Sequence, residues 1–409
     1  LVVLVHAAIP GERVRAVVER IGQGVAYATT MDVLEASPDR RSGIRDWACG
    51  GNVYAHVAYP RQLELKAQVI ADALSRIGKV ALDAPVPVTP SPEEGYRMRA
   101  RLHVRGRMLG FFREGTHGLC DPASTRQLLP ETCELVKALS TELYEGRLDG
   151  VTEIELSENV PATERALHLE LSRPDTPQGL ADLARLPSVV GVSASFGASG
   201  RGGAASTRRT ITAGGSPCVL DTLDLPARHA APVQVRLQHH AQAFFQANRY
   251  LLARLAGRVV SLVPEGPVAD LYAGVGLFSA SLAASGWTSV IAVEGDRAGA
   301  ADLRANAAPF GRAFSPVEMA VEAYLATRPV SGDTTIIVDP PRTGMSKEAS
   351  AAIAAQKAGR LIYVSCDVAT FARDTRKLID AGYSLARLEA FDLFPNTAHV
   401  EAIAVFSRA

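Results

Sequence analysis

Cysteine is scarce in this 409-residue sequence, and the five cysteines stand far apart. Such spacing gives no disulfide framework, so we expect a protein of the reducing cytoplasm and not a small secreted scaffold. No apolar run reaches the length of about 18 residues that a membrane-spanning helix needs. The N-terminal LVVLV is too short for a signal peptide and lacks a basic flank. The cysteines are Cys49, Cys120, Cys133, Cys218 and Cys366.

An excess of charge of either sign is also lacking. The 43 Lys and Arg residues balance 43 Asp and Glu residues, which excludes a uniformly basic coat for nucleic acid. One local basic face is present in YRMRARLHV at 96–104, where basic and apolar residues alternate. The pattern is typical both of a solvated strand face and of a surface that tracks phosphate groups. The basic residues are Arg97, Arg99, Arg101 and His103.

The length predicts two or three domains, and the sequence pattern divides the chain into four parts. Residues 1–40 alternate short apolar runs with turn residues, which predicts an OB-like β-barrel that lacks one N-terminal strand. Residues 41–92 form a predicted loop and helical linker. Residues 93–231 predict an α+β domain, in which the Gly- and Ser-rich segment 197–209 is weakly ordered.

The last part, residues 232–409, predicts an α/β fold. Strands that are apolar throughout and alternate with helices are typical of a mostly parallel sheet covered on both faces. Ligands of such sheets bind beyond the carboxyl ends of the strands, so polar residues there are candidates for a functional site. The strands are expected near 268–272, 290–294, 335–339, 360–365, 384–390 and 400–406, and the helices near 277–285, 298–308, 346–357 and 368–381.

A glycine-containing turn, DLYAGVG at 270–276, follows the first of these strands. Gly274 lets the backbone approach a ligand, but Ser279 stands where a dinucleotide-binding fingerprint has its third glycine. Glu294 ends the next strand, 20 positions after Gly274 (294 − 274), and an acid there can hold both ribose hydroxyls of an adenosine. The pattern suggests an adenosyl cofactor without phosphates, S-adenosylmethionine. Taken alone, Glu294 is more typical of an ordinary strand-end carboxylate.

A thiol stands at the end of a later strand. Residues 361–364 are apolar, and Cys366 separates them from a helical pattern. A cysteine at a helix N-terminus has a lowered pKa and more thiolate, which makes Cys366 a candidate nucleophile. A lone cysteine after a strand is otherwise typical of a small core residue.

Two acids stand where predicted strands end or begin. Asp339 opens DPPR, whose proline pair fixes a rigid turn that presents Asp339 and Arg342, although a structural loop has the same form. Glu401 opens the last strand among apolar residues, where it is out of place unless capped or facing solvent. A thiolate and a carboxylate beside a methyl donor suggest methylation of uracil at C5. The thiolate adds to C6, and the carboxylate removes the C5 proton after methyl transfer, with no need for a metal.

Five segments closely resemble the RNA uracil-5-methyltransferases, and FFQAN resembles the FFQxN segment of that family. Members of the family act on the T-loop uridine of tRNA or on uridines of 23S rRNA. The resemblance implies RNA as the substrate, a monomer, a class I (Rossmann-like) S-adenosylmethionine methyltransferase domain and an N-terminal TRAM domain. The five segments, in order, are DLYAGVGLFS, AVEGD, IIVDPPRTG, LIYVSCDVATFARD and FDLFPNTAHVE.

The resemblance also implies roles for single residues. Cys366 would be the nucleophile and Glu401 the base, while Arg342 would help to position the uracil or the nucleophile. The implied cofactor contacts are Gln246, Tyr272, Glu294 and Asp339.

The chain departs from the family pattern where many members hold a 4Fe-4S cluster. ACGGN keeps Cys49, but Asn52 stands where another cysteine is usual. Four thiolates are normally required, so we expect no cluster. Val368 replaces a usual proline after the nucleophile, which predicts a slight shift of this loop.

Other functions compete with uracil methylation. RNA cytosine-5 enzymes also use a cysteine, but they commonly show a Pro-Cys pair where this chain has DPPR. Amino-group methyltransferases carry an aromatic residue where this chain has Arg342, and they do not need Cys366. A noncatalytic RNA-binding protein with the same fold would need neither Cys366 nor Glu401. The sequence leaves open which RNA is the substrate.

Overall fold

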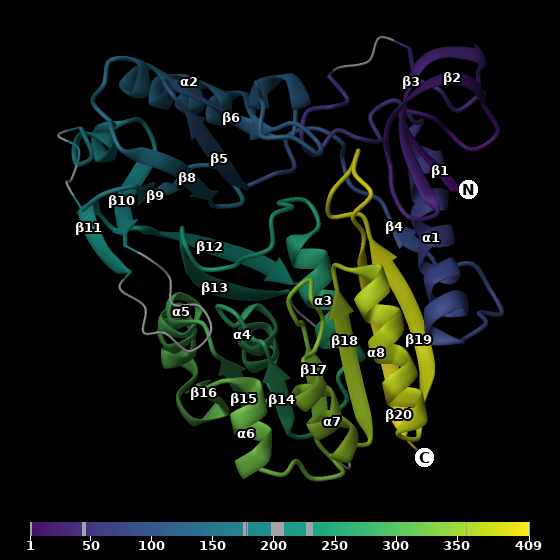
Figure 1. Ribbon diagram of the computed structural model, residues 1–409. Coiled ribbons are helices and arrows are strands. Elements are labelled where there is room, and N and C mark those ends of the chain that lie inside the picture. Colours follow the sequence, from purple (N-terminus) through teal and green to yellow (C-terminus); the bar gives the residue numbers. More distant parts are fainter. Residues whose placement is uncertain are drawn as a thin grey trace.

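The computed structural model of this chain describes residues 2–42, 46–174, 177, 179–197, 208–225, 232–356 and 358–408. It contains an N-terminal sheet with a linker helix, a central sheet with one long helix, and a large C-terminal sheet (Figure 1). In Figure 1 the central part, in blue and teal, lies above the green and yellow C-terminal sheet.

Three strands make up the N-terminal sheet: β1 (Val2–His6), β2 (Arg13–Ile21) and β3 (Val25–Glu35). The middle strand, β3, is parallel to β1 and antiparallel to β2. Apolar side chains such as Val3 and Val17 are exposed on this open sheet. A closed barrel buries one face of its strands, so the incomplete barrel expected from the sequence stays a prediction.

The linker contributes a helix and an edge strand. Helix α1 (Tyr59–Ala73) continues into a π-helical turn, Leu74–Gly78, and the two cover the helical pattern of the linker. Strand β4 (Val88–Thr89) pairs in parallel with β19 (Tyr383–Phe391) and so extends the C-terminal sheet. The local sequence predicts only a linker here, because the partner of β4 lies near the other end of the chain.

The central part is a seven-stranded sheet in the order β11-β10-β9-β8-β5-β6-β7, with α2 (Pro130–Tyr144) packed on it. Neighbouring strands are antiparallel, except that β9 and β10 are parallel. Residues 198–207 of the Gly- and Ser-rich segment lie outside the described residues. The strands are β5 (Arg99–Arg105), β6 (Met108–Phe112), β7 (Leu119–Cys120), β8 (Val151–Glu158), β9 (Arg165–Leu171), β10 (Val189–Phe196) and β11 (Arg209–Gly215), and the short 3-10 helices are Pro122–Thr125 and Asp182–Arg185.

Acidic residues of β8 pair with the basic face of β5. Arg101 lies 2.6 Å from Glu155 and 3.3 Å from Glu153. His103 lies 3.1 Å from Glu153. Opposite charges across an antiparallel pair stabilise the sheet and reduce the net charge of its face. The acidic partners of Arg101 and His103 thus argue against a phosphate-tracking surface on this face.

Cys49 and Cys120 form a disulfide, with an S–S distance of 2.01 Å. The sequence predicts no disulfide framework; this single bond forms because the fold brings together residues 71 positions apart. Cys133, Cys218 and Cys366 are free thiols. The cysteine pattern therefore no longer argues for a reducing compartment.

The C-terminal sheet has eight strands in the order β16-β15-β14-β17-β18-β20-β19-β4. Neighbouring strands are parallel, except that β20 is antiparallel to both β18 and β19. The chain runs from β14 outward to β16 and then resumes at β17 on the other side of β14. This reversal is a topological switch point, where ligands bind at the carboxyl ends. The strands not yet given are β14 (Val268–Leu271), β15 (Val290–Glu294), β16 (Phe314–Glu318), β17 (Thr335–Val338), β18 (Arg360–Ser365) and β20 (Glu401–Arg408).

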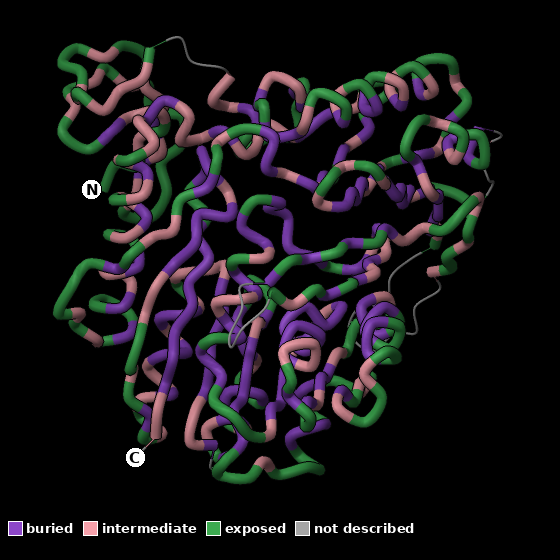
Figure 2. The backbone as a smooth tube through the Cα atoms, turned by 180° about the vertical axis from the view of Figure 1, so that it is seen from behind, coloured by how far each residue is buried: buried purple, intermediate pink, exposed green. Residues whose placement is uncertain are grey.

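Helices cover both faces of this sheet over two apolar layers. Ile337 and Ile362 belong to the layer under α3, α4 and α5, and Ile336 and Leu361 belong to the layer under α6, α7 and α8. Side chains alternate between faces along a strand, and Figure 2 shows these strands as buried over most of their length. The predicted α/β class is confirmed. The helices are α3 (Leu252–Leu262), α4 (Leu277–Ala284), α5 (Arg297–Ala307), α6 (Val321–Thr327), α7 (Lys347–Ala355) and α8 (Val368–Asp380), with a 3-10 segment Ala308–Ala313.

Strands β12 (Cys218–Leu225) and β16 and helix α6 add to the elements expected from the sequence. Strand β16 and helix α6 complete one side of the C-terminal sheet. A separate antiparallel pair, β12 and β13 (Val233–His240), joins the central and C-terminal parts. The predicted domain boundary at 231/232 divides this pair.

Candidate active site

Polar residues from several segments meet in one cavity at the carboxyl edge of the C-terminal sheet. Its volume is about 630 Å³. Glu401 opens β20, and because β20 runs antiparallel to β18, its start lies at the same edge as the ends of the parallel strands. The lining includes all eight predicted site residues: Gln246, Tyr272, Gly274, Glu294, Asp339, Arg342, Cys366 and Glu401.

Glu294 and Gly274 form the end of the cavity beside β14 and β15. The Glu294 carboxylate accepts hydrogen bonds from the backbone N–H groups of Gly274, at 2.7 Å, and Asp296, at 2.6 Å. Each carboxylate oxygen keeps a further lone pair for a ligand hydroxyl. Gly274 has a φ of 56°, which glycine adopts without strain. A single side chain thus joins the turn after β14 to the end of β15.

Tyr272 holds a left-handed backbone conformation, with a φ of 62°, that is unfavourable for an aromatic residue. Its hydroxyl is buried and has no hydrogen-bond partner within the described residues. Burial raises the pKa of this hydroxyl. Backbone strain and unpartnered buried polar atoms are concentrated at ligand sites.

Two acids with raised pKa values lie at the ends of β14 and β17. Asp270 is fully buried and accepts a hydrogen bond from the Ser279 hydroxyl at 2.6 Å. Burial raises the pKa of Asp270 to about 7. Burial, with the nearby Asp270 carboxylate, raises the pKa of Asp339 to about 8. Both carboxyl groups therefore hold a proton more tightly than an exposed acid does.

Cys366 lies between β18 and α8, the position predicted from the sequence. Asp367 caps the helix, and its carboxylate accepts a hydrogen bond from the Thr370 N–H at 2.8 Å. The prediction of a lowered thiol pKa is wrong, because burial raises the pKa of Cys366 to about 12. The carboxylates of Glu401 and Asp339 add to this shift. The helix end is visible in the sequence, whereas the acids come from other strands.

Glu401 lies opposite Phe391 of β19 and is 2% exposed. Its Oε1 atom has no hydrogen-bond partner in the part of the chain that the structure describes. Burial raises the pKa of Glu401 well above its usual value; Asp339 raises it further, and the Arg342 guanidinium opposes the rise. A carboxyl group with a raised pKa, in one cavity with a thiol, is suited to proton transfer.

Arg342 lies on the exposed rim of the cavity, in the turn after β17. The turn is closed by a hydrogen bond from the Gly344 N–H to the Pro341 carbonyl at 2.7 Å. Gly344 has a φ of 74°, and a side chain there would meet the Asp374 carboxylate at 2.9 Å. Asp374 also accepts a hydrogen bond from the Met345 N–H at 3.0 Å. The turn is thus fixed against α8, the helix that follows the thiol.

The cavity also contains residues that the sequence predictions omit. Phe244 lines it and is 68% exposed, and Phe394 lines it from the loop between β19 and β20. Phe244 lies two positions before Gln246, so the FFQAN segment gave a signal for it. Arg99 donates to the carbonyl oxygens of Ala241, at 2.8 Å, and Ala243, so a central strand holds the segment that leads to Phe244.

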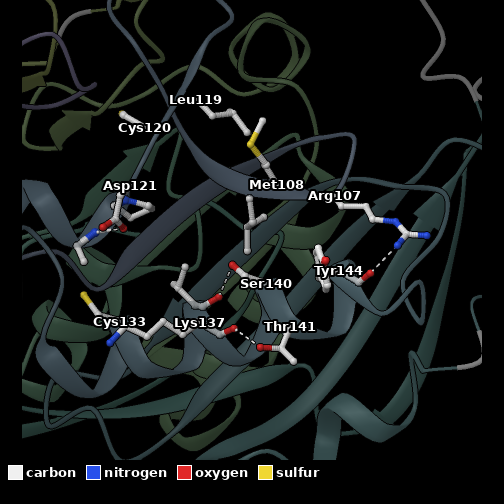
Figure 3. A pocket seen from close by; sticks show the side chains of 14 residues that line it. Arg107, Met108, Leu119, Cys120, Asp121, Cys133, Lys137, Ser140, Thr141 and Tyr144 are labelled. Atoms are coloured by element: carbon white, nitrogen blue, oxygen red, sulfur yellow. Dashed lines mark hydrogen bonds between the residues drawn. The ribbon is translucent and has the colours of Figure 1, made fainter.

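A second cavity, of about 570 Å³, lies in the central part between α2 and strands β6 and β7 (Figure 3). Cys120 and Cys133 lie on its wall, together with Lys137 of α2. Arg107 donates a hydrogen bond to the Tyr144 carbonyl at 2.9 Å at one end. This cavity shares no lining residue with the first, so the predicted site residues gather in the first alone.

Known proteins are similar to this chain in sequence over nearly its whole length. The chain is 32% identical over 432 aligned positions to the 23S rRNA (uracil(1939)-C(5))-methyltransferase RlmD of Methylococcus capsulatus, covering 100% of this chain and 92% of that protein. It is 30% identical to the protein of the same name from Pseudomonas putida, over 98% of this chain and 88% of that protein. The chain belongs to the RNA uracil-5-methyltransferase family.

A family model and a solved structure also match this member of the RNA uracil-5-methyltransferase family. The model of the tRNA (uracil-5-)-methyltransferase family matches residues 331–409. A solved structure, the Pyrococcus abyssi tRNA (uracil-54, C5)-methyltransferase in complex with S-adenosyl-L-homocysteine, is similar over 99% of this chain and 95% of its own. The TM-score is 0.76 at 23% identity. This similarity confirms the class I (Rossmann-like) methyltransferase fold.

The residues of this chain do not fit a 4Fe-4S cluster. Cys49 is bonded to Cys120, and Asn52 donates a hydrogen bond to the Asp46 carbonyl at 3.3 Å. Within the described ranges, no group of three or more His, Cys, Asp or Glu side chains could hold a metal ion. The absence of a cluster stays a prediction. Among the described helices, none has the length and apolar character to cross a bilayer.

Proposed function

We propose that this protein is an S-adenosylmethionine-dependent RNA methyltransferase that forms 5-methyluridine in 23S rRNA. The observation that carries the proposal is the one cavity that holds the Cys366 thiol, the Glu401 carboxyl group and the Glu294 carboxylate. The relatives at 30–32% identity are named for 23S rRNA, which favours that RNA over tRNA. The monomeric state stays a prediction.

The residues at the Glu294 end fit S-adenosylmethionine. Glu294 would bind the ribose hydroxyls, and Gly274 lets the backbone approach the ligand. The Tyr272 hydroxyl, buried and without a partner among the described residues, is available to a ligand, and Gln246 and Asp339 line the same space. When bound, S-adenosylmethionine supplies an electrophilic methyl group.

Cys366 and Glu401 would act in turn on the uracil ring. The Cys366 thiolate forms a bond to C6, and the C5=C6 electron pair moves to C5 and O4. C5, now nucleophilic, takes up the methyl group. The Glu401 carboxylate removes the C5 proton, the C5=C6 bond re-forms, and the thiolate leaves C6. The thiolate is regenerated, and the net products are methylated uracil, S-adenosylhomocysteine and one proton.

Because the pKa of the Cys366 thiol is raised, the site must promote loss of the thiol proton before the first step. Cys366 has to lose its proton, although burial and the nearby carboxylates disfavour the thiolate. The Arg342 guanidinium lowers the pKa of Cys366. Arg342 would therefore assist the nucleophile as well as bind the substrate at the rim.

One experiment separates this proposal from a cytosine-5 enzyme and from a noncatalytic RNA-binding protein. The purified protein is incubated with S-adenosylmethionine and with 23S rRNA or tRNA transcripts, and the digested nucleosides are quantified by mass spectrometry. We expect 5-methyluridine in 23S rRNA alone. Product in tRNA alone would change the substrate, and 5-methylcytidine would change the target base. No methylated nucleoside in either RNA would favour the noncatalytic protein.

A further inference from the structure

Four consecutive carbonyl groups in the loop between β19 and β20 accept hydrogen bonds from distant parts of the chain. A surface loop commonly leaves such groups to water. Here the backbone carbonyl groups of residues 393–396 are all hydrogen-bonded to other parts of the protein. The acceptors are Leu393, Phe394, Pro395 and Asn396, and the donors, in the same order, are Asn248 (3.0 Å), Lys66 (3.1 Å), the Tyr96 hydroxyl (3.4 Å) and the Tyr54 N–H (2.8 Å).

Lys66 of α1 also forms a buried ion pair with the residue that begins this loop. Its Nζ atom lies 2.5 Å from Oδ1 of Asp392, and the two side chains are 1% and 0% exposed. Lys66 belongs to the buried stripe of α1, where an amphipathic helix normally carries apolar residues. A buried ion pair contributes little stability compared with apolar residues of the same volume. The Lys66–Asp392 ion pair is therefore better explained by its effect on the position of the loop than by its effect on stability.

Gln62, one turn earlier on α1, forms a reciprocal pair with Asn396. Gln62 Nε2 donates to Asn396 Oδ1 at 3.0 Å, and the Asn396 N–H donates to Gln62 Oε1 at 2.9 Å. Asn396 has a φ of 64°, a conformation that a residue other than glycine keeps where its surroundings hold it. Both side chains are buried. The pair therefore fixes the bend of the loop.

The loop that α1 holds belongs to the wall of the active-site cavity. Phe394, whose carbonyl accepts from Lys66 and which lies two positions before the Gln62 contact at Asn396, lines the cavity. Glu401 follows Asn396 by five positions (401 − 396) and opens β20. Its Oε1 atom lacks a hydrogen-bond partner among described residues, so the backbone at the start of β20 sets where the carboxylate points. Figure 1 shows α1 and β4 beside the yellow end of β19.

We propose that Gln62 and Lys66 are positioning residues for the release step. They hold the loop at residues 392–396, and through it Phe394 and the Glu401 carboxylate, where the C5 proton is removed. The inference rests on the proposed function, because it assumes the covalent intermediate. Freeing the loop should slow proton removal more than the preceding methyl transfer, so that the covalent protein–RNA adduct accumulates.

Two variants loosen the loop, and one serves as a matched control. Gln62→Ala removes the reciprocal pair, and the double variant Lys66→Met/Asp392→Leu removes both charges without leaving either one unpaired. Ile70→Ala lies one turn further along the same buried stripe and weakens only apolar packing. Single-turnover reactions with a labelled methyl donor, quenched in detergent, give the rate of label entering the adduct and the rate of its release as free RNA.

The ratio of the release rate to the transfer rate should fall roughly 10- to 100-fold in Gln62→Ala and in the double variant. In Ile70→Ala the ratio should stay at the wild-type value. Should either loop variant fail to fold, Asn396→Gly keeps the left-handed backbone and its N–H but loses the side-chain oxygen that accepts from Gln62, and a smaller fall is expected. An unchanged ratio in the folded loop variants would overturn the inference.

Glu401→Gln, measured in parallel, separates this inference from the proposed function. We expect the adduct to accumulate in that variant, because the base itself is missing. If it does not accumulate while the wild-type protein methylates RNA, the covalent mechanism is wrong and the inference falls with it. If it accumulates in Glu401→Gln but not in the loop variants, only the positioning role is wrong.

Discussion

The two ends of the active-site cavity are built in different ways. At the proposed cofactor end, Glu294 and Gly274 stand 20 positions apart and bond directly; Gly274 lies in the turn after β14, and Glu294 ends the neighbouring β15. At the reaction end, the loop before Glu401 is held by Lys66 and Gln62, which lie 326 and 334 positions away from their partners. The first end is local in sequence, and the second depends on a helix outside the methyltransferase sheet. Substitutions should therefore separate cofactor binding from chemistry.

Removal of the thiol is the largest expected effect. Cys366→Ala should lower methyl transfer by at least roughly 10⁴-fold, as loss of a catalytic nucleophile does. Binding of S-adenosylhomocysteine should be unchanged, because its proposed contacts lie at the other end of the cavity. Methyl incorporation and calorimetry measure the two, with Cys218→Ala as the control for loss of a free thiol. Near-normal turnover by Cys366→Ala would show that methyl transfer does not need this thiol.

The matching substitution at the cofactor end is Glu294→Gln. Hydrogen bonds to a charged group are worth roughly 1.5–3 kcal/mol, so the affinity for S-adenosylhomocysteine should fall roughly 10- to 100-fold. The ratio of release to methyl transfer should not change. Calorimetry measures the affinity, and Glu318→Gln, at a half-exposed acid on the neighbouring β16, is the control. Equal affinities in wild type and Glu294→Gln would remove Glu294 from the cofactor site.

A smaller effect tests the contact between thiol and base. The Glu401 carboxylate contributes to the pKa of about 12 at Cys366, after burial. Glu401→Gln removes this charge, which lowers the pKa and should raise the rate of alkylation by iodoacetamide at pH 9 roughly threefold to tenfold. Peptide mass spectrometry follows Cys366, and Cys218, whose pKa burial also raises to about 12, is the internal control. Identical rates at Cys366 would mean that Glu401 does not influence the thiol.

Acids with raised pKa values also make stability depend on pH. The pKa of Asp339 is raised from 3.8 to about 8. The folded state therefore binds the proton more tightly than the unfolded chain, and the stability that this proton contributes is lost as the pH rises from about 4 to 8. Asp339→Asn, which stays neutral, should raise the free energy of unfolding by roughly 1–3 kcal/mol at pH 8 and by much less at pH 4.

Denaturant unfolding at the two pH values measures this difference, with the exposed Asp72→Asn as the control. A gain of the same size at both pH values would contradict a raised pKa at Asp339. The same logic applies to Glu401, whose pKa burial raises well above its usual value. Its retention in the fold despite that cost agrees with a role in the reaction.

The local end of the cavity could be predicted from the sequence. Gly274 and Glu294 follow apolar strands, and Cys366 separates a strand from a helix, so their positions at one sheet edge follow from the α/β pattern. The acid that opens β20 was visible because an acid is unusual in an apolar strand. The resemblance to a family added Gln246, which no local pattern singles out.

Contacts between distant segments could not be predicted in this way. The thiol pKa depends on Glu401 and Asp339, which the fold alone brings near Cys366. The disulfide at Cys49 and the pairing of β4 with β19 likewise join segments that are far apart in the chain, and no local sequence pattern indicates which segments meet. The pattern of α1 predicts a helix, but not that its buried stripe holds an active-site loop.

The most direct test of the account is whether Glu401→Gln traps a covalent complex with RNA. The variant is incubated with a 23S rRNA fragment and S-adenosylmethionine, and denaturing gels and mass spectrometry report the product. The account predicts a protein–RNA adduct that carries one added methyl group and is absent in the double variant Cys366→Ala/Glu401→Gln. No adduct, or an adduct that persists without Cys366, would contradict it.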